Sequence, residues 1–394
     1  MRISRRTFVG GVAAWAGLAA GGCRCLQGRD GRTYSAAILG DLHYDRSPET
    51  FYHAKFISEF GGTGRYPGRF KELTRNAVMW QGPSRRILAA SGKCVTDDTA
   101  LVLQMGDLIQ GDCNDFALHR RMLDETAALM KSAYPESLPF VTTCGNHDVR
   151  EGGDGRDLAA TPVYAAFARD FHRKEFGGRA CGAIEHSTFA FRQGPDLFLV
   201  LDFNQAEHQL ELVRRLLDGN RDVRYTFVVT HGGIFPFDSW NNCRWFCLGG
   251  THTIGLAFDP AADPVRREMR ALLARRNAIV LCGHTHHLEL KEADFPEGRI
   301  TELTMNSVPF MTGGGEYPGE PAVVREGAAS YGDVDWVRNE PTMKALFDEY
   351  RPFMRRYYFA NAAGHARLRV SDDGVSVDYY GRDSLVPTKT FRLR

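Results

Sequence analysis

The sequence predicts an α/β fold in which strands and helices alternate along one large domain. Five apolar, β-rich runs, at 35–39, 100–105, 140–144, 225–229 and 278–282, each end directly before a short polar motif. Helical patterns with apolar residues three and four positions apart lie between them, at 116–133, 207–217 and 265–276. Asp263-Pro264 is a typical start for the last of these helices. Repeated strand and helix indicate a largely parallel inner sheet.

After residue 286 the pattern changes to consecutive strands. Runs at 299–306, 366–370, 375–380 and 388–393 predict a second sheet packed on the first, with Asp372-Asp373-Gly374 as a turn between two of them. Four remaining stretches are expected to be loop insertions that cover or line a site: about 51–93, 151–175, 232–260 and 313–339.

Composition is that of a globular protein with a sizeable core. The 394 residues are 43% hydrophobic and 25% charged, which excludes a disordered chain. The polar motifs extend from residue 41 to residue 287, so most of the chain must converge on one site. Without residues 1–25 the formal net charge changes from +1 to −3, since that segment holds Arg2, Arg5, Arg6 and Arg24. No basic footprint for nucleic acid remains, and the oligomeric state stays open.

The five polar motifs carry the groups that bind metals. They are Asp41-Leu-His43, Gly106-Asp107, Gly145-Asn146-His147-Asp148, Thr230-His231 and Gly283-His284-Thr285-His286-His287. Their positions after strands place all five at the edge where open α/β sheets build their sites. Carboxylate, imidazole and amide donors together suit manganese, iron or zinc better than calcium. Two such ions about 3.5 to 4 Å apart can hold both oxygens of an in-line phosphoryl displacement and generate hydroxide near neutral pH.

In order and content these motifs closely resemble those of the calcineurin-like metallophosphoesterases. The resemblance implies a four-layer αββα arrangement, a two-sheet β-sandwich flanked by helices, over residues 33–394. It implies that one metal is held by Asp41, His43, Asp107 and His286, and the other by Asp107, Asn146, His231 and His284. His147 matches the family's catalytic histidine, which stabilises the transition state and protonates the leaving oxygen.

Four further residues in or near these motifs have no assigned part in binding the metals. Gln110 stands where many members carry an aspartate and where the related purple acid phosphatases carry a metal-bound tyrosine, so the chain departs from both. Asp112 is a candidate to support His147 instead, and Asp148 is expected to orient its surroundings. His287 has no family role, and we expect it to pack beside the site.

The resemblance implies a dinuclear metal-dependent phosphoesterase that hydrolyses mono- or diesters of a phosphorylated small molecule by attack of a metal-bridging hydroxide. Monoesterase, phosphodiesterase, nucleotidase and pyrophosphatase activities all remain open. The alternative is a non-catalytic phosphate- or carbohydrate-binding protein on the same scaffold, which would lack a ligand or His147. A metallo-β-lactamase-like hydrolase would need a His-x-His-x-Asp-His run, which the sequence does not contain.

The N-terminus predicts export. Ser4-Arg5-Arg6-Thr7 precedes an apolar run at 8–20, and residues 1–25 resemble a twin-arginine signal peptide. We therefore expect a periplasmic or extracellular protein. Two alternatives stay open: a signal anchor that is not removed, and a lipid anchor at Cys23 after the weak lipoprotein box Ala20-Gly21-Gly22.

The cysteines and a run of arginines point to packing and solvent exposure. Nine cysteines in a chain of this length do not indicate a disulfide framework. Cys144 and Cys282 are expected in the core, and Cys243 and Cys247 form either a disulfide or two buried thiols. For the arginines of the helix at 265–276, a solvated face is the favoured interpretation over an anion site: Arg266, Arg267, Arg270, Arg275 and Arg276.

Overall fold

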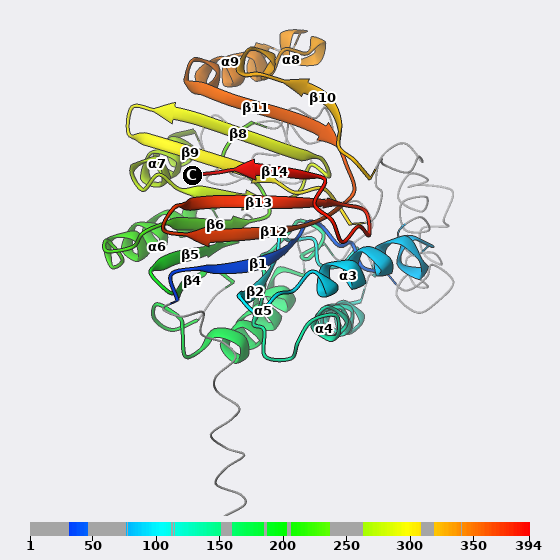
Figure 1. The fold of residues 1–394 in the computed structure, drawn as a ribbon. Helices are drawn as coiled ribbons and strands as arrows, with labels where there is room; N and C mark the ends of the chain where they lie inside the picture. Colours follow the sequence, from blue (N-terminus) through cyan, green and yellow to red (C-terminus); the bar gives the residue numbers. More distant parts are fainter. Residues whose placement is uncertain are drawn as a thin grey trace, which may run out of the picture.

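Two mixed β-sheets lie face to face, with helices on both outer sides (Figure 1). This computed structural model describes residues 31–45, 76, 78–111, 113, 115–150, 160–184, 187–202, 206–236, 263–308, 319–339 and 341–394. The predicted α/β sandwich flanked by helices is confirmed. The expected insertion at 232–260 lies largely outside the described residues.

The first sheet joins the early strands to the last ones. Its order is β14-β13-β12-β1-β2-β3. The strands are β1 (Tyr34–Leu39), β2 (Thr99–Gln104), β3 (Phe140–Thr142), β12 (Gly364–Ser371), β13 (Gly374–Gly381) and β14 (Lys389–Arg392). β1 is parallel to β2 and antiparallel to β12, where Tyr34 pairs with Val370.

The prediction that the last strands belong to the second sheet is therefore wrong for β12, β13 and β14. All six residues of β1 are buried. A buried strand needs hydrogen-bonding neighbours on both edges, because unpaired backbone groups away from water are costly. β2 satisfies one edge and β12 the other, a long-range pairing that no local pattern reveals.

The second sheet holds eight strands in the order β10-β11-β8-β9-β7-β6-β5-β4. They are β4 (Phe189–Gln193), β5 (Asp196–Leu201), β6 (Thr226–Thr230), β7 (Ile279–Cys282), β8 (Leu288–Phe295), β9 (Gly298–Thr304), β10 (Ala322–Glu326) and β11 (Met354–Asn361). β5, β6, β7 and β9 run parallel, and the remaining pairings are antiparallel. The five strands that precede the polar motifs are thus divided between the two sheets.

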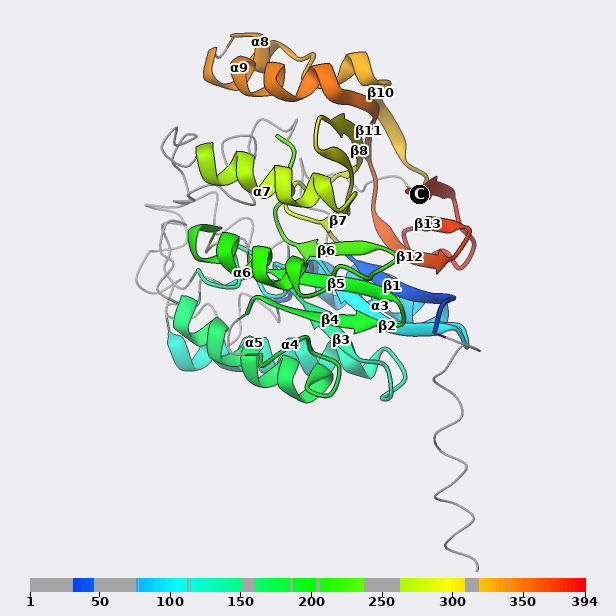
Figure 2. The ribbon, with the colours of Figure 1, turned by 90° about the vertical axis from the view of Figure 1, so that its left-hand side faces the viewer.

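Helices cover the outer face of each sheet. The first sheet is covered by α3 (Pro83–Lys93), α4 (Phe116–Ser132) and α5 (Thr161–Phe176). The second is covered by α6 (Ala206–Asp218), α7 (Asp263–Arg275), α8 (Asp335–Asn339) and α9 (Pro341–Tyr350). Figure 2 shows α6 and α7 running beside the strands of the second sheet. Short 3-10 turns lie at Ala328–Ser330 and Arg351–Phe353.

Four of these elements fall where loop insertions were expected. α3 lies within 51–93, β10 and α8 lie within 313–339, and α5 begins within 151–175 and ends one residue beyond it. In α5 the apolar residues Tyr164, Phe167 and Ala168 are buried against the first sheet, so their three- and four-residue spacing outweighs the glycine-rich stretch that precedes them.

Three apolar layers hold the sandwich together. In β1, Ala36 and Ile38 face the second sheet, whereas Ala37 and Leu39 face the helices. In β6, Phe227 and Val229 face the first sheet and Val228 faces α7. A strand buried on both faces is a continuous apolar run, which is why these strands could be located from the sequence.

Buried polar and sulfur-containing side chains complete the packing. Cys144 and Cys282 are buried as expected, while Cys243 and Cys247 lie outside the described residues. The expectation of a solvated arginine face on α7 is wrong for Arg266, which is 1% exposed and pairs with Glu349 at 2.7 Å. Arg270 also forms an ion pair with Glu349, so this residue of α9 neutralises two arginines of α7.

His172 of α5 gives the fold a predicted sensitivity to acid. Its side chain is fully buried, and Nε2 accepts a hydrogen bond from the Thr142 N–H at 3.3 Å. Burial lowers the pKa of His172 from 6.5 to about 3. As the pH is lowered below 6.5, His172 is protonated in the unfolded chain but stays neutral in the folded one. The free energy of unfolding therefore decreases as the pH falls from about 6.5 toward 3.

We expect His172→Gln, which keeps an acceptor but cannot be protonated, to lessen this fall. Between pH 8 and pH 5 the wild type should lose about 2 kcal/mol more unfolding free energy than the variant, measured by urea denaturation. Equal losses in the two proteins would show that His172 does not contribute.

Candidate metal centre

The polar motifs of both sheets meet at one junction. Asp41 and His43 follow β1, Asp107 follows β2, and Asn146 and His147 come shortly after β3, all from the first sheet. His231 follows β6, and His284 and His286 come just after β7, from the second sheet. Backbone contacts cross the junction, since His284 N–H donates to both oxygens of Asp41 at 3.1 and 3.0 Å. Neither sheet holds the whole site.

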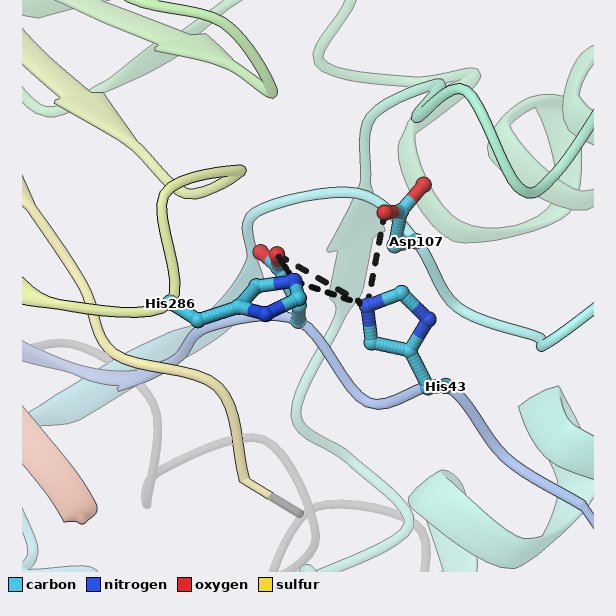
Figure 3. Close-up of side chains that lie close together, drawn as sticks. His43, Asp107 and His286 are labelled. Carbon is cyan, nitrogen blue, oxygen red and sulfur yellow. Dashed lines mark hydrogen bonds and ion pairs between the residues drawn. The ribbon is translucent and has the colours of Figure 1, made fainter. Parts of the chain in front are cut away.

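The first group comprises Asp41, His43, Asp107 and His286, whose ligand atoms all lie within 4.8 Å of one another. Figure 3 shows His43, Asp107 and His286 pointing toward one another. His43 Nε2 lies 3.1 Å from His286 Nε2, and His286 Nε2 lies 3.2 Å from Asp41 Oδ2. His286 is the most exposed of the four, at 17% of its side chain.

The second group comprises Asp107, His231 and His284, within the same limit. His231 Nε2 lies 3.2 Å from Asp107 Oδ2 and 3.1 Å from His284 Nδ1. Asn146 Oδ1 is also 3.1 Å from His231 Nε2, so the amide joins this group. Asp107 Oδ2 lies 3.5 Å from His43 Nε2 as well and is therefore common to both groups.

Contacts behind the ligands fix which nitrogens face inward. His43 Nδ1 donates to Gln110 Oε1 at 3.1 Å, which leaves the lone pair of Nε2 directed at His286. His231 Nδ1 donates to the Met105 carbonyl at 2.8 Å, which leaves Nε2 facing Asp107, Asn146 and His284. Acceptor atoms that converge in this way need a proton or a cation between them.

Without a cation, a proton on His231 can supply the positive charge that these acceptor atoms require. Burial acts to lower the pKa of His231, but the carboxylates of Asp107 and Asp41 outweigh it and raise the pKa to about 9. Burial acts to raise the pKa of Asp107, but His231 and the neighbouring histidines hold it well below its usual range. A divalent cation would displace this proton, so the donor set fits a metal centre.

Backbone conformation at the site is unusual. His43, Asp107, His284 and His286 have positive φ angles of 44°, 49°, 75° and 64°. Such conformations cost about 1 to 3 kcal/mol each and gather at functional sites. The glycines beside the ligands are needed for close approach: a Cβ at Gly145 would lie 2.1 Å from Asp107 Oδ1, and one at Gly283 would lie 2.1 Å from Asp41 Oδ1.

His147 lies beside the two groups. Its N–H donates to Asp107 Oδ1 at 2.8 Å, and its Nδ1 donates to the Gln110 carbonyl at 2.8 Å. The ring stands edge-on to His43 with centroids 4.3 Å apart. Arg150 Nη2 lies 2.8 Å from His147 Nε2. The backbone of His147 is thus tied to the shared carboxylate, and its ring is held by the Gln110 carbonyl and Arg150.

Asp148 and His287 occupy supporting positions. Asp148 accepts hydrogen bonds from Gly145 N–H at 2.8 Å and Ile109 N–H at 3.1 Å, so it ties two of the loops together. Burial first, and then the charge of Asp107, raise the pKa of Asp148 well above its usual range. His287 packs against Phe359 with ring centroids 4.8 Å apart. Asp112 lies outside the described residues.

Three supporting residues were not found from the sequence. The sequence showed that Gln110 departs from the residue usual in the family, but it did not predict the hydrogen bond between Gln110 and His43. Arg150 was detectable only as a cation three residues after His147. Glu302 had no signal, because it lies within β9; its buried carboxylate accepts the N–H of Ile234 just after His231 and pairs with Lys291 at 3.2 Å.

A sandwich whose two sheets bring carboxylates and imidazoles together at one junction is typical of metal-dependent hydrolases. Residues 34–288 match the family model for calcineurin-like phosphoesterases, and the chain belongs to this family. A comparison with curated proteins found no match.

The fold is similar to two solved structures at low sequence identity. The structure of PhoD has 13% identity and a TM-score of 0.48, covering 92% of this chain and 68% of that one. GAP50, the anchor in the inner membrane complex of Plasmodium, has 12% identity and a TM-score of 0.44, covering 92% and 88%. Within the described residues, no helix is both long and apolar enough to cross a membrane.

We expect Asp107→Asn to lower metal content at both positions, because the shared carboxylate loses its charge toward each ion. Metal analysis of protein saturated with manganese or zinc and then passed through a desalting column measures this. His147→Ala is the matched control and should retain its metals. Unchanged metal content in Asp107→Asn would contradict the bridging position.

We expect Gln110→Ala to weaken metal binding by about 10- to 100-fold, because His43 loses the acceptor that orients its ring. Competition with a fluorescent metal indicator measures the affinity. Gln110→Glu keeps an acceptor oxygen at the same reach and should restore most of the affinity. If alanine and glutamate behave alike, the contact with His43 is not what matters.

Proposed function

We propose that the protein is a dinuclear metal-dependent phosphoesterase that hydrolyses phosphate mono- or diesters. The observation that carries this proposal is the position of Asp107 Oδ2, which is 3.5 Å from His43 Nε2 and 3.2 Å from His231 Nε2. One carboxylate between two histidine groups is suited to bridging two ions. Membership of the calcineurin-like phosphoesterase family supports the same reaction class.

In this proposal each residue has a defined part. Asp41, His43, Asp107 and His286 hold one ion, and Asp107, Asn146, His231 and His284 hold the other. Manganese, iron or zinc suits this mixture of oxygen and nitrogen donors. When bound, two such ions polarise phosphoryl oxygens and lower the pKa of water, which is the chemistry that ester hydrolysis requires.

His147 is the proposed catalytic residue. Its Nδ1 is committed to the Gln110 carbonyl, so Nε2 is the atom that exchanges a proton with the substrate. A proton held there would pass to the leaving oxygen as the ester bond breaks. Arg150 Nη2 donates toward the same nitrogen at 2.8 Å, so in this proposal the guanidinium turns to the phosphoryl group, where negative charge develops, and leaves Nε2 free to hold the proton.

Export remains part of the proposal. The twin-arginine pattern and the apolar run that follows it support a periplasmic or extracellular location, with the lipid anchor at Cys23 as the alternative. The substrate is a phosphorylated small molecule whose identity depends on loops that the ligand set does not specify. A non-catalytic phosphate- or carbohydrate-binding protein is the competing hypothesis.

Hydrolysis by the metal-loaded chain tests the proposal. The purified protein is stripped of metal, reloaded with manganese, iron or zinc, and assayed with para-nitrophenyl phosphate beside bis-para-nitrophenyl phosphate. Metal-dependent cleavage supports the enzyme, and the preferred ester separates a phosphatase or nucleotidase from a phosphodiesterase. No turnover of either, with two metals bound, would favour the binding protein.

We expect His147→Ala to slow the preferred reaction by about 10² to 10⁴, the usual scale of general acid–base catalysis. Metal content measured on the same preparation separates this effect from loss of the ions. A variant that keeps both its metals and full turnover would remove His147 from the mechanism.

A further inference from the structure

A cavity lined by several charged side chains lies away from the candidate metal centre. Its volume is about 510 Å³, and its lining includes four arginines together with Asn277 and Asp294: Arg224, Arg276, Arg299 and Arg394. Arg224 precedes β6, Arg276 precedes β7, Asp294 and Arg299 lie at the ends of β8 and β9 that are joined by their turn, and Arg394 follows β14. Such a concentration of guanidinium groups indicates affinity for an anion.

The cavity and the metal centre are at opposite ends of the same strands. Tyr225 lines the cavity and immediately precedes β6, whose other end leads into His231. Asn277 lines it shortly before β7, whose other end leads into His284. A strand of this length extends about 15 Å. A ligand in the cavity therefore could not touch the metal ligands.

Two of the four arginines are already neutralised. Arg224 contacts Asp196 and Asp372, each at 2.6 Å. Arg299 contacts Asp294 at 2.6 Å. Asp294, the carboxylate in the cavity lining, is shared further with Arg355 at 2.5 Å, so its charge is committed to these partners.

The other two arginines donate to neutral oxygens. Arg276 Nη2 donates to the Asn220 carbonyl. Arg394 Nη2 donates to the Asn277 carbonyl at 2.7 Å, and its Nη1 donates to Thr301 Oγ1. Within the described part of the chain, neither guanidinium forms an ion pair with a carboxylate.

Neighbouring charges reinforce this imbalance. Burial and the charge of Arg221 lower the pKa of Arg276, against the opposing effect of Asp218 and Asp222. Burial, Arg299 and Arg356 lower the pKa of Arg394, against the opposing effect of Glu292. Half-buried cations held near like charges are costly, and an anion between them would offset that cost.

We propose that this cavity is a second binding site, in which Arg276 and Arg394 hold a phosphate-bearing anion of up to mononucleotide size. Guanidinium groups match phosphate oxygens through paired N–H donors, which favours phosphate over a simple halide. The cavity volume falls in the range of small-molecule sites. The site is independent of the phosphoesterase reaction.

Calorimetric titration of inorganic phosphate into the metal-loaded full chain tests the proposal. Wild type and Asp107→Asn should both bind phosphate at this site. Arg276→Gln with Arg394→Gln should weaken that binding about 10-fold or more, from the loss of charge-assisted hydrogen bonds. Arg338→Gln is the matched control, since Arg338 pairs with Asp335 outside the cavity lining and should have no effect.

Two further measurements keep the result interpretable. The double glutamine variant should retain wild-type metal content and turnover, because the metal centre is untouched. If it fails to fold, Arg276→Lys with Arg394→Lys preserves the charges and should lose less affinity than Arg276→Gln alone. Phosphate binding that survives in the double glutamine variant but disappears in Asp107→Asn would overturn the second site.

Discussion

The candidate site depends on the junction between the two sheets. Each sheet contributes part of a set of carboxylates and imidazoles whose acceptor atoms converge there. Asp41 and Asp107 come from the first sheet, and His231 and His284 come from the second. The distances between them are set by the apolar layer between the sheets, including Ile38 and Val229. Hydrogen bonds between the sheets also fix this junction, since His231 Nδ1 donates to the Met105 carbonyl across the interface. Any change in how the sheets pack would move the two halves of the site apart.

Several features of this junction are energetically unfavourable. Buried carboxylates, imidazoles that face one another and left-handed backbone at ligand positions are each unfavourable without a positive charge among them. Close glycines and buried supports such as Gln110 and Glu302 over-determine the geometry, so the loops keep their conformation despite the strain. The site is therefore pre-organised by its surroundings, and the energy of metal binding need not be spent on arranging the ligands.

Prediction of the fold from sequence succeeded where the determinants were local. Strands buried on both faces appear as continuous apolar runs, and the polar motifs of the candidate site lie within a few residues of their ends. Prediction failed where a contact joins residues that are far apart in the sequence. The partner of β1 is β12, and the carboxylate opposite Arg266 is Glu349 on another helix. The hydrogen bond from His43 to Gln110 depends on loop conformations that residue types alone do not specify.

The pairing of β1 with β12 has a consequence for how the molecule is made. β1 carries Asp41 and His43 at its end, yet one of its edges stays open until Gly364–Ser371 has left the ribosome. The last candidate ligand is His286, so a nascent chain that already contains all the candidate ligands still exposes an unpaired strand. Long-range pairing of this kind folds slowly and leaves edges that attract other chains. The strand edge beside the candidate site is therefore completed only after β12 has been synthesised, and β1 is open to contacts with other chains until then.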